Sequence, residues 1–297
     1  MKKVKEYVVN FINGFCMALA DSVPGVSGGT IAFILGFYDK FIGALDDLFR
    51  GNLEEKKKAL IYLIKIGIGW AVGFVLAAIV LSSLFESKIY QMSSLFIGFI
   101  VLAIPLVIKE EKDSIVGKYK NIIFCILGIA LVVGISLLTK TTLVEVNFAK
   151  PNLGTYLYTF IAGAIAICAM VLPGISGSTL LLIFGIYIPV MNAIKTFLTF
   201  DFSVVPILCA FGFGIIFGIV AFIRILKTCL KKFRSATIYC ILGMMIGSLY
   251  AIVLGPTTLD VPKEMLTFET FSIVFFLIGC AIIIGLEVLK KYLLKDE

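Results

Sequence analysis

The sequence predicts an all-α polytopic membrane protein built from two inverted repeats, and three observations support this fold class. Of the 297 residues, 60% are hydrophobic and 15% charged, and the mean hydropathy is +1.09. The basic residues gather in short segments between long charge-free intervals, and one glycine-rich motif occurs once in each half. The composition excludes a soluble domain, because about a quarter of the residues in such domains are charged.

The charge-free intervals have the lengths of membrane-crossing helices. A helix needs roughly 20 apolar residues to cross about 30 Å of hydrocarbon. Two longer intervals contain a Pro-Gly break near the middle, which stops a helix, and these predict helical hairpins at 7–38 and 152–194. The remaining intervals predict single spans at about 63–85, 89–108, 120–139, 202–224, 235–257 and 268–289.

The distribution of Lys and Arg predicts the orientation, because short cytoplasmic loops retain basic residues. All but five of the 26 basic residues lie in segments 1–6, 39–65, 109–120, 224–234 and 290–297. This pattern places both termini in the cytoplasm. It also predicts that the first hairpin enters and leaves on the cytoplasmic face and the second on the outer face.

The two hairpins differ in the length of their first legs. Residues 7–22 would reach only about 24 Å as a helix, so the first hairpin is predicted to be re-entrant. Residues 152–172 almost suffice to span, which leaves the second open between a re-entrant hairpin and a full helical pair. Residues 51–58 are predicted to form a solvated surface loop.

An internal repeat relates the two halves. Residues 23–30 match residues 172–179 at an offset of 149, and the same offset places Gly36 and Tyr38 on Gly185 and Tyr187. Each half therefore reads as a hairpin plus three spans, 1–150 and 151–297. Because three is odd, the second half enters the membrane from the opposite side, which predicts a pseudo-two-fold axis in the membrane plane.

Glycines spaced four apart in the spans predict close helix packing. Gly69 and Gly73 form one such pair, and Gly214 and Gly218 form the matching pair in the second half. Small residues at this spacing let helices approach closely in lipid. These glycines support the fold and say little about a substrate.

The repeated Pro-Gly-x-Ser-Gly turns are the candidate binding site. Irregular backbone at membrane depth is tolerated only where it is buried in protein or lines a cavity. Pro24 and Pro173 end the first legs, and Gly25 and Gly174 allow the turns. Hydroxyls and backbone amides then begin the next legs, an arrangement that favours an oxyanion. The alternative is that these residues only cap the new helices. The predicted phosphate-binding residues are Ser27, Gly28, Gly29, Thr30, Ser176, Gly177, Ser178, Thr179 and Arg224.

Four further polar residues have two interpretations each. Asp21 is an acid inside an apolar hairpin, with Met170 at the matching place, and is either a coupling residue for protons or sodium or a helix cap. Arg224 either pairs with a phosphate or extends to the cytoplasmic surface. Tyr38 and Tyr187 either contact the substrate or anchor the protein at the interface.

The composition disfavours an enzyme. The chain has no histidine, the commonest general base, and its seven cysteines show no Cys-x-x-Cys pair. No metal site, cofactor, nucleic-acid module or ATP-binding loop is predicted.

Residues 21–38 together with residues 170–178 resemble the polyprenyl-phosphate transporters, formerly a family of unknown function. The resemblance covers nearly the whole chain. It implies translocation of undecaprenyl phosphate, the lipid carrier of bacterial cell-wall synthesis, across the cytoplasmic (inner) membrane for reuse. The phosphate would cross between the turns while the polyprenyl tail stays among the membrane lipids. The alternative function is a secondary transporter of a small soluble anion, and a homodimer is left open.

Overall fold

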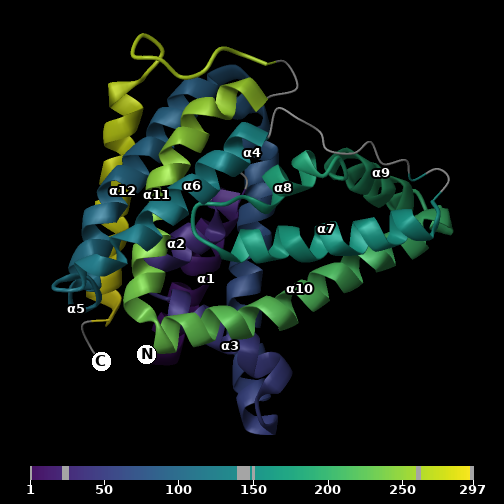
Figure 1. Ribbon diagram of the computed structural model, residues 1–297, viewed down its shortest axis with the longest axis horizontal. Helices are drawn as coiled ribbons and strands as arrows, with labels where there is room; N and C mark the ends of the chain where they lie inside the picture. Colours follow the sequence, from purple (N-terminus) through teal and green to yellow (C-terminus); the bar gives the residue numbers. More distant parts are fainter. Residues whose placement is uncertain (1, 22–26, 139–147, 149–150, 259–261, 295–297) are drawn as a thin grey trace.

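The computed structural model describes residues 2–21, 27–138, 148, 151–258 and 262–294, and every regular element within them is a helix (Figure 1). Six segments of this part of the chain are long and apolar enough to cross a membrane. The predicted class, an all-α polytopic membrane protein, is confirmed. These segments are Leu53–Ala77, Lys88–Glu110, Tyr119–Leu138, Leu153–Val171, Phe202–Lys232 and Arg234–Thr257.

The helices follow the same order in both halves. Each half begins with a long helix, a short helix and a helix of intermediate length, and longer apolar helices follow. The first half contains α1 (Lys2–Asp21), α2 (Gly28–Ile34), α3 (Tyr38–Arg50), α4 (Leu53–Glu110), α5 (Lys112–Ile115), η1 (Tyr119–Asn121) and α6 (Ile122–Leu138). The second contains α7 (Leu153–Val171), α8 (Gly177–Ile183), α9 (Tyr187–Leu198), η2 (Phe202–Val204), α10 (Val205–Lys232), α11 (Arg234–Leu254), η3 (Gly255–Thr258) and α12 (Ile273–Leu294).

Helix α4 contains both of the spans predicted at 63–85 and 89–108. Its backbone leaves helical geometry at Lys88, where φ is −127° and ψ is 36°, so two helices join there across a kink. The helix begins at Leu53, and the prediction of a loop over 51–58 is therefore wrong for most of that stretch. A capping box explains the early start, because the side chains of Asn52 and Glu55 bond each other's backbone amides.

The returning legs of the hairpins begin with very short helices. Helices α2 and α8 have 7 residues each, and a helix of that length rises only about 10 Å. Two residues after the end of each lies a glycine with a left-handed backbone, Gly36 at φ 71° and Gly185 at φ 66°. Glycine adopts this conformation without a steric penalty. The second hairpin thus pairs a span-length first leg with a short helix, rather than two full spans.

Glycines bring each hairpin's first leg against the next long helix. On α4, Gly69 lies against Phe11 and Gly73 against Phe15 of α1. On α10, Gly214 lies against Phe160 of α7. In the first pair the residue numbers rise together, so α1 and the first part of α4 run parallel. The prediction that these glycines serve helix packing is confirmed.

A second set of glycine contacts links the two halves. Gly243 of α11 packs against Cys125 of α6, and Gly247 packs against Ile129. Gly98 of α4 and Gly279 of α12 make the corresponding contacts between those two helices. Each half therefore packs its last helix against the other half, as the neighbouring helices in Figure 1 show. Helices α6 and α11 run parallel, as the predicted orientation requires; the pseudo-two-fold relation stays a prediction.

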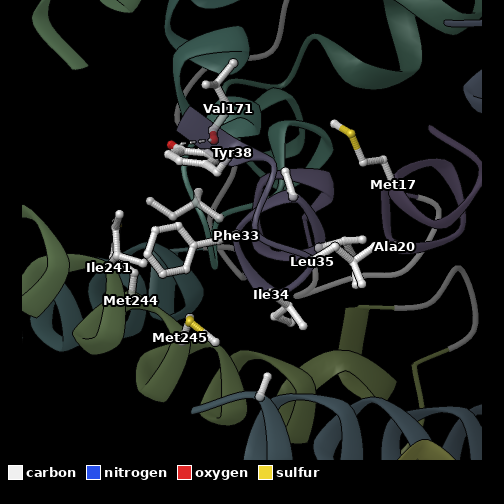
Figure 2. Close-up of a cluster of buried hydrophobic side chains, with 14 of the residues drawn as sticks. Met17, Ala20, Phe33, Ile34, Leu35, Tyr38, Val171, Ile241, Met244 and Met245 are labelled. Carbon is white, nitrogen blue, oxygen red and sulfur yellow. Dashed lines mark hydrogen bonds between the residues drawn. The ribbon is translucent and has the colours of Figure 1, made fainter. Parts of the chain in front are cut away.

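The short helix α2 lies at the centre of the molecule, and all its residues are buried. Its Phe33 and Ile34 face Ile241, Met244 and Met245 of α11 (Figure 2). A helix that is apolar on every side belongs in a protein interior. Packing from α11 therefore holds the first turn in the core.

Charged residues from three predicted cytoplasmic segments form two groups of ion pairs, which are together called the ion-pair cluster. Lys227 of α10 pairs with Asp46 and Asp47 of α3 at 2.8 and 2.9 Å. Arg234 of α11 pairs with Asp39 at 2.8 Å and also with Glu111. The cluster, completed by Arg50 on Asp46, joins the two halves on one side of the molecule.

The glycine contacts predict opposite effects for two substitutions. In Gly243→Ala the new Cβ meets the carbonyl oxygen of Cys125, so we expect a loss of about 1–3 kcal/mol of stability. In Gly134→Ala the new Cβ has nothing within 4 Å, and alanine raises helix stability by up to about 1 kcal/mol. Thermal unfolding of the detergent-solubilised variants measures both. Equal effects would contradict the α6–α11 packing.

The ion-pair cluster predicts a pH-dependent stability. Burial raises the pKa of Asp46, but hydrogen bonds from Lys227 and Arg50 outweigh it and hold that pKa below the usual range. A depressed folded-state pKa stabilises at neutral pH, and that contribution is lost as the pH falls below about 4. In thermal unfolding, Lys227→Met should lower the midpoint at pH 7 and flatten the loss at acidic pH. Lys231→Met, an exposed site on the same helix, is the control and should match the wild type.

Candidate functional site

The two Pro-Gly-x-Ser-Gly turns meet inside the protein. The hydroxyl of Ser27 donates a hydrogen bond to the carbonyl oxygen of Leu172 at 3.0 Å. In return, the amide of Gly174 donates to the hydroxyl of Thr30 at 2.8 Å and to that of Ser27 at 3.2 Å. The structure thus brings together two motifs that lie almost half a chain apart in sequence.

Local chemistry fixes the first turn. Ser27 has an extended backbone and is the N-cap of α2, where its side chain accepts a hydrogen bond from the amide of Thr30 at 3.2 Å. The two hydroxyls also lie 3.1 Å apart. Ser27 is 1% exposed and Thr30 is fully buried. The Ser27 side chain therefore both caps α2 and contacts the second turn, and the Thr30 hydroxyl shares the second contact.

The second turn contributes mainly backbone to this contact. Gly174 has a φ of +86°, and a Cβ there would lie 2.5 Å from the carbonyl oxygen of Met244, so only glycine fits. Gly29 of the first turn lies so close to Val171 that a Cβ would collide with its carbonyl. Ser176 is the buried N-cap residue of α8, but its side chain makes no capping bond there.

Tyr38 adds a further link between the turns. It is 2% exposed, and its hydroxyl donates to the carbonyl oxygen of Val171 at 3.1 Å (Figure 2). Its ring also packs edge-on against Phe33. In this structure Tyr38 therefore lies in the protein core and stabilises the meeting of the turns.

Asp21 lies beside the first turn at the end of α1. One carboxylate oxygen accepts a hydrogen bond from the amide of Gly28 at 2.6 Å, and the other accepts from the indole N–H of Trp70 at 3.0 Å. Sequence reasoning missed Trp70. The available signal was that Trp70 is the only tryptophan of the chain and lies within a predicted span.

Known proteins that resemble this chain give the family. Residues 17–270 match the family described as undecaprenyl phosphate translocase-like. The chain belongs to this family. It is 33% identical to a polyprenyl-phosphate transporter of Vibrio cholerae over 257 residues, which are 83% of this chain and 78% of that relative. It is 34% identical to a polyprenyl-phosphate transporter of Staphylococcus aureus over 275 residues, 91% and 93% of the two chains. No solved structure matches the chain.

The other predicted site residues of this translocase-like chain are placed as follows. Gly177 is buried at the start of α8, close to Ala166, and Thr179 is half-buried. Pro173 is buried, Tyr187 is half-buried and Arg224 is exposed on α10. Pro24, Gly25 and the side chain of Ser178 lie outside the described part of the chain. Within that part, no group of three His, Cys, Asp or Glu side chains is placed to hold a metal ion.

The contact of Tyr38 predicts a cost for removing one hydroxyl. Tyr38→Phe leaves the buried carbonyl of Val171 without this donor, so we expect the protein to lose about 1–3 kcal/mol of stability. Tyr187→Phe, at the matching but half-buried position, is the control and should cost less. Thermal unfolding of both variants in detergent tests this, and equal midpoints would argue against the hydroxyl's role.

Proposed function

We propose that this protein translocates undecaprenyl phosphate across the bacterial cytoplasmic membrane, so that the lipid carrier is reused in cell-envelope synthesis. The meeting of the two turns is the observation that carries this proposal. Two relatives named polyprenyl-phosphate transporters, each sharing about a third of its residues, support the substrate. Those names also support transport rather than catalysis.

The turns offer the chemistry that a phosphate monoester needs. The hydroxyls of Ser27, Thr30 and Ser176 are buried beside the backbone amides of the turns. In the sequence, Asp21 is the one charged residue of segments 21–30 and 170–179. Hydrogen bonds to an ionised phosphate are roughly twice as strong as those between neutral groups. The phosphate would cross between the turns while the apolar tail stays in the surrounding lipid.

A phosphate can reach these hydroxyls only when the turns separate. Ser27 and Thr30 are buried and bonded to Leu172 and Gly174. The present arrangement is therefore the closed one, in which polar groups of each turn are hydrogen-bonded to the other turn. Substrate oxygens would replace those partners, which keeps the buried groups hydrogen-bonded throughout.

The packing suggests which parts move. The segment Lys88–Glu110 and the helices α6, α11 and α12 interlock the two halves through glycine contacts. The first legs of the hairpins pack instead on the first part of α4 and on α10, and the turns contact α11 at Met244. We therefore propose that the two hairpin units move against the interlocked helices, rather than one whole half against the other.

Asp21 is the residue proposed to couple transport to an ion. Both of its oxygens accept N–H donors, whereas sodium, a hard cation, would need oxygen ligands around it. Among the described residues, no ion pair of Asp21 is formed. Because the two N–H donors stabilise the ionised carboxylate, we propose that Asp21 takes up a proton only when the turns separate and these hydrogen bonds break.

Binding in nanodiscs tests the proposal. Wild-type protein should bind undecaprenyl phosphate in preference to inorganic phosphate, because only the lipid places its tail in the membrane. Ser27→Ala/Ser176→Ala should weaken that binding by roughly tenfold or more, as charged hydrogen bonds are lost. Ser248→Ala is the matched control, because this buried serine donates its hydrogen bond to Met245 of its own helix.

The alternative outcomes have distinct meanings. Equal competition by inorganic phosphate would favour a carrier of a small soluble anion. Lipid binding that survives the double substitution would place the headgroup away from the turns. Absent lipid binding by the wild type would contradict the proposal as a whole.

A further inference from the structure

Asp21 and Trp70 are a pair that only the first half of the chain possesses. The turn motif repeats at an offset of 149, which places Asp21 on Met170. The following span repeats at an offset of 145, which places Trp70 on Ile215. The acceptor and its indole donor are thus both replaced by apolar residues in the second half. The hydrogen bond between Asp21 and Trp70 therefore has no counterpart at these positions of the second half.

The fold of the turn does not require the carboxylate. In the first half, a Cβ on Gly28 would meet the carboxylate oxygens of Asp21 at 2.8 and 2.9 Å. In the second half, a Cβ on Gly177 would meet the Cβ of Met170 at 3.2 Å. The same packing contact is therefore made by an acid in one turn and by a thioether side chain in the other.

A buried carboxylate is costly unless hydrogen bonds satisfy it. The amide of Gly28 and the indole of Trp70 each satisfy one oxygen of Asp21. The indole is itself held in place, because its ring stacks on Phe74 with centroids 5.0 Å apart and planes at 12°. Without the indole, one oxygen would lose its donor and the carboxylate would no longer have a single preferred position.

The pair also connects the turns to α4. The second turn bonds Ser27, the next residue Gly28 bonds Asp21, and Asp21 bonds Trp70 of α4. Four groups from α7–α8, α2, α1 and α4 are thus in successive contact. Helix α4 continues across the kink at Lys88 to the part that links the halves, so these contacts form a connected route from the turns to that part.

We propose that Trp70 is a positioning residue for Asp21, which holds the carboxylate on the first turn so that separation of the turns is transmitted to α4. The inference rests on the proposed function, since it assigns a role within the same site. Trp70 does not touch the substrate. It acts through the carboxylate, and the two residues form one functional unit.

Transport of a fluorescently labelled polyprenyl phosphate into proteoliposomes tests this role. Trp70→Phe keeps an aromatic ring but has no donor, and we expect a loss of roughly ten- to a hundredfold in rate. Trp70→His retains an N–H on a smaller ring and should recover part of that loss. If packing alone mattered, Phe would be the better replacement, and this order of activities would overturn the proposal.

A double-substitution cycle tests whether the residues act as one unit. Asp21→Met and Trp70→Ile install the residues of the second half, singly and together. For one unit, the double variant should be no slower than the worse single variant, whereas independent residues would multiply their losses. Met170→Leu and Ile215→Leu, at the matching positions, are the controls and should transport at nearly the wild-type rate.

The single tryptophan gives a readout that does not depend on transport. Adding undecaprenyl phosphate to wild-type protein in nanodiscs should change the fluorescence emission of Trp70, and Asp21→Met should abolish that response. Equal responses in both proteins would overturn the link between Asp21 and Trp70.

These experiments separate the two proposals. If the wild type neither binds nor transports the lipid, the proposed function fails. If it does both while Trp70→Phe behaves like the wild type, only the positioning role of Trp70 fails.

Discussion

The structure depends on one constraint: polar backbone that is not helical must find partners inside the protein, because the membrane interior offers none. The two turns meet this requirement by bonding each other. Ser27 and Thr30 supply hydroxyls to the second turn, and Leu172 and Gly174 return a carbonyl and an amide. The position of α2 in the core, the close glycine contacts and the burial of Tyr38 all follow from keeping these groups together.

The two turns share a motif and differ in chemistry. The first uses its side chains, caps its own helix and has a carboxylate beside it. The second offers its backbone and has Met170 where the acid would be. The two turns are therefore not equivalent, although they meet in one place.

The packing of the long helices adds a second constraint on motion. Because α11 packs on α6 and α12 packs on α4, neither half can move as a body without breaking contacts with the other. The ion-pair cluster between α3, α10 and α11 joins the halves again at the side predicted to be cytoplasmic.

The sequence by itself determined the class of fold, because hydropathy and membrane-crossing length are properties of each local stretch. The long apolar helices overlap the charge-free intervals of the sequence. One local prediction was wrong: the charged stretch after Asn52 was expected to be a loop, but it is helical because a capping box starts α4 there.

Only the tertiary structure decided the partners. No pattern in the chain shows that Ser27 bonds Leu172, that Asp21 bonds Trp70, or that Arg224 lies exposed on α10. Such contacts depend on how each helix is rotated and how closely glycines let the helices approach, and these quantities are settled by packing across the whole molecule. Residues far apart in sequence therefore acquire their roles when the helices assemble.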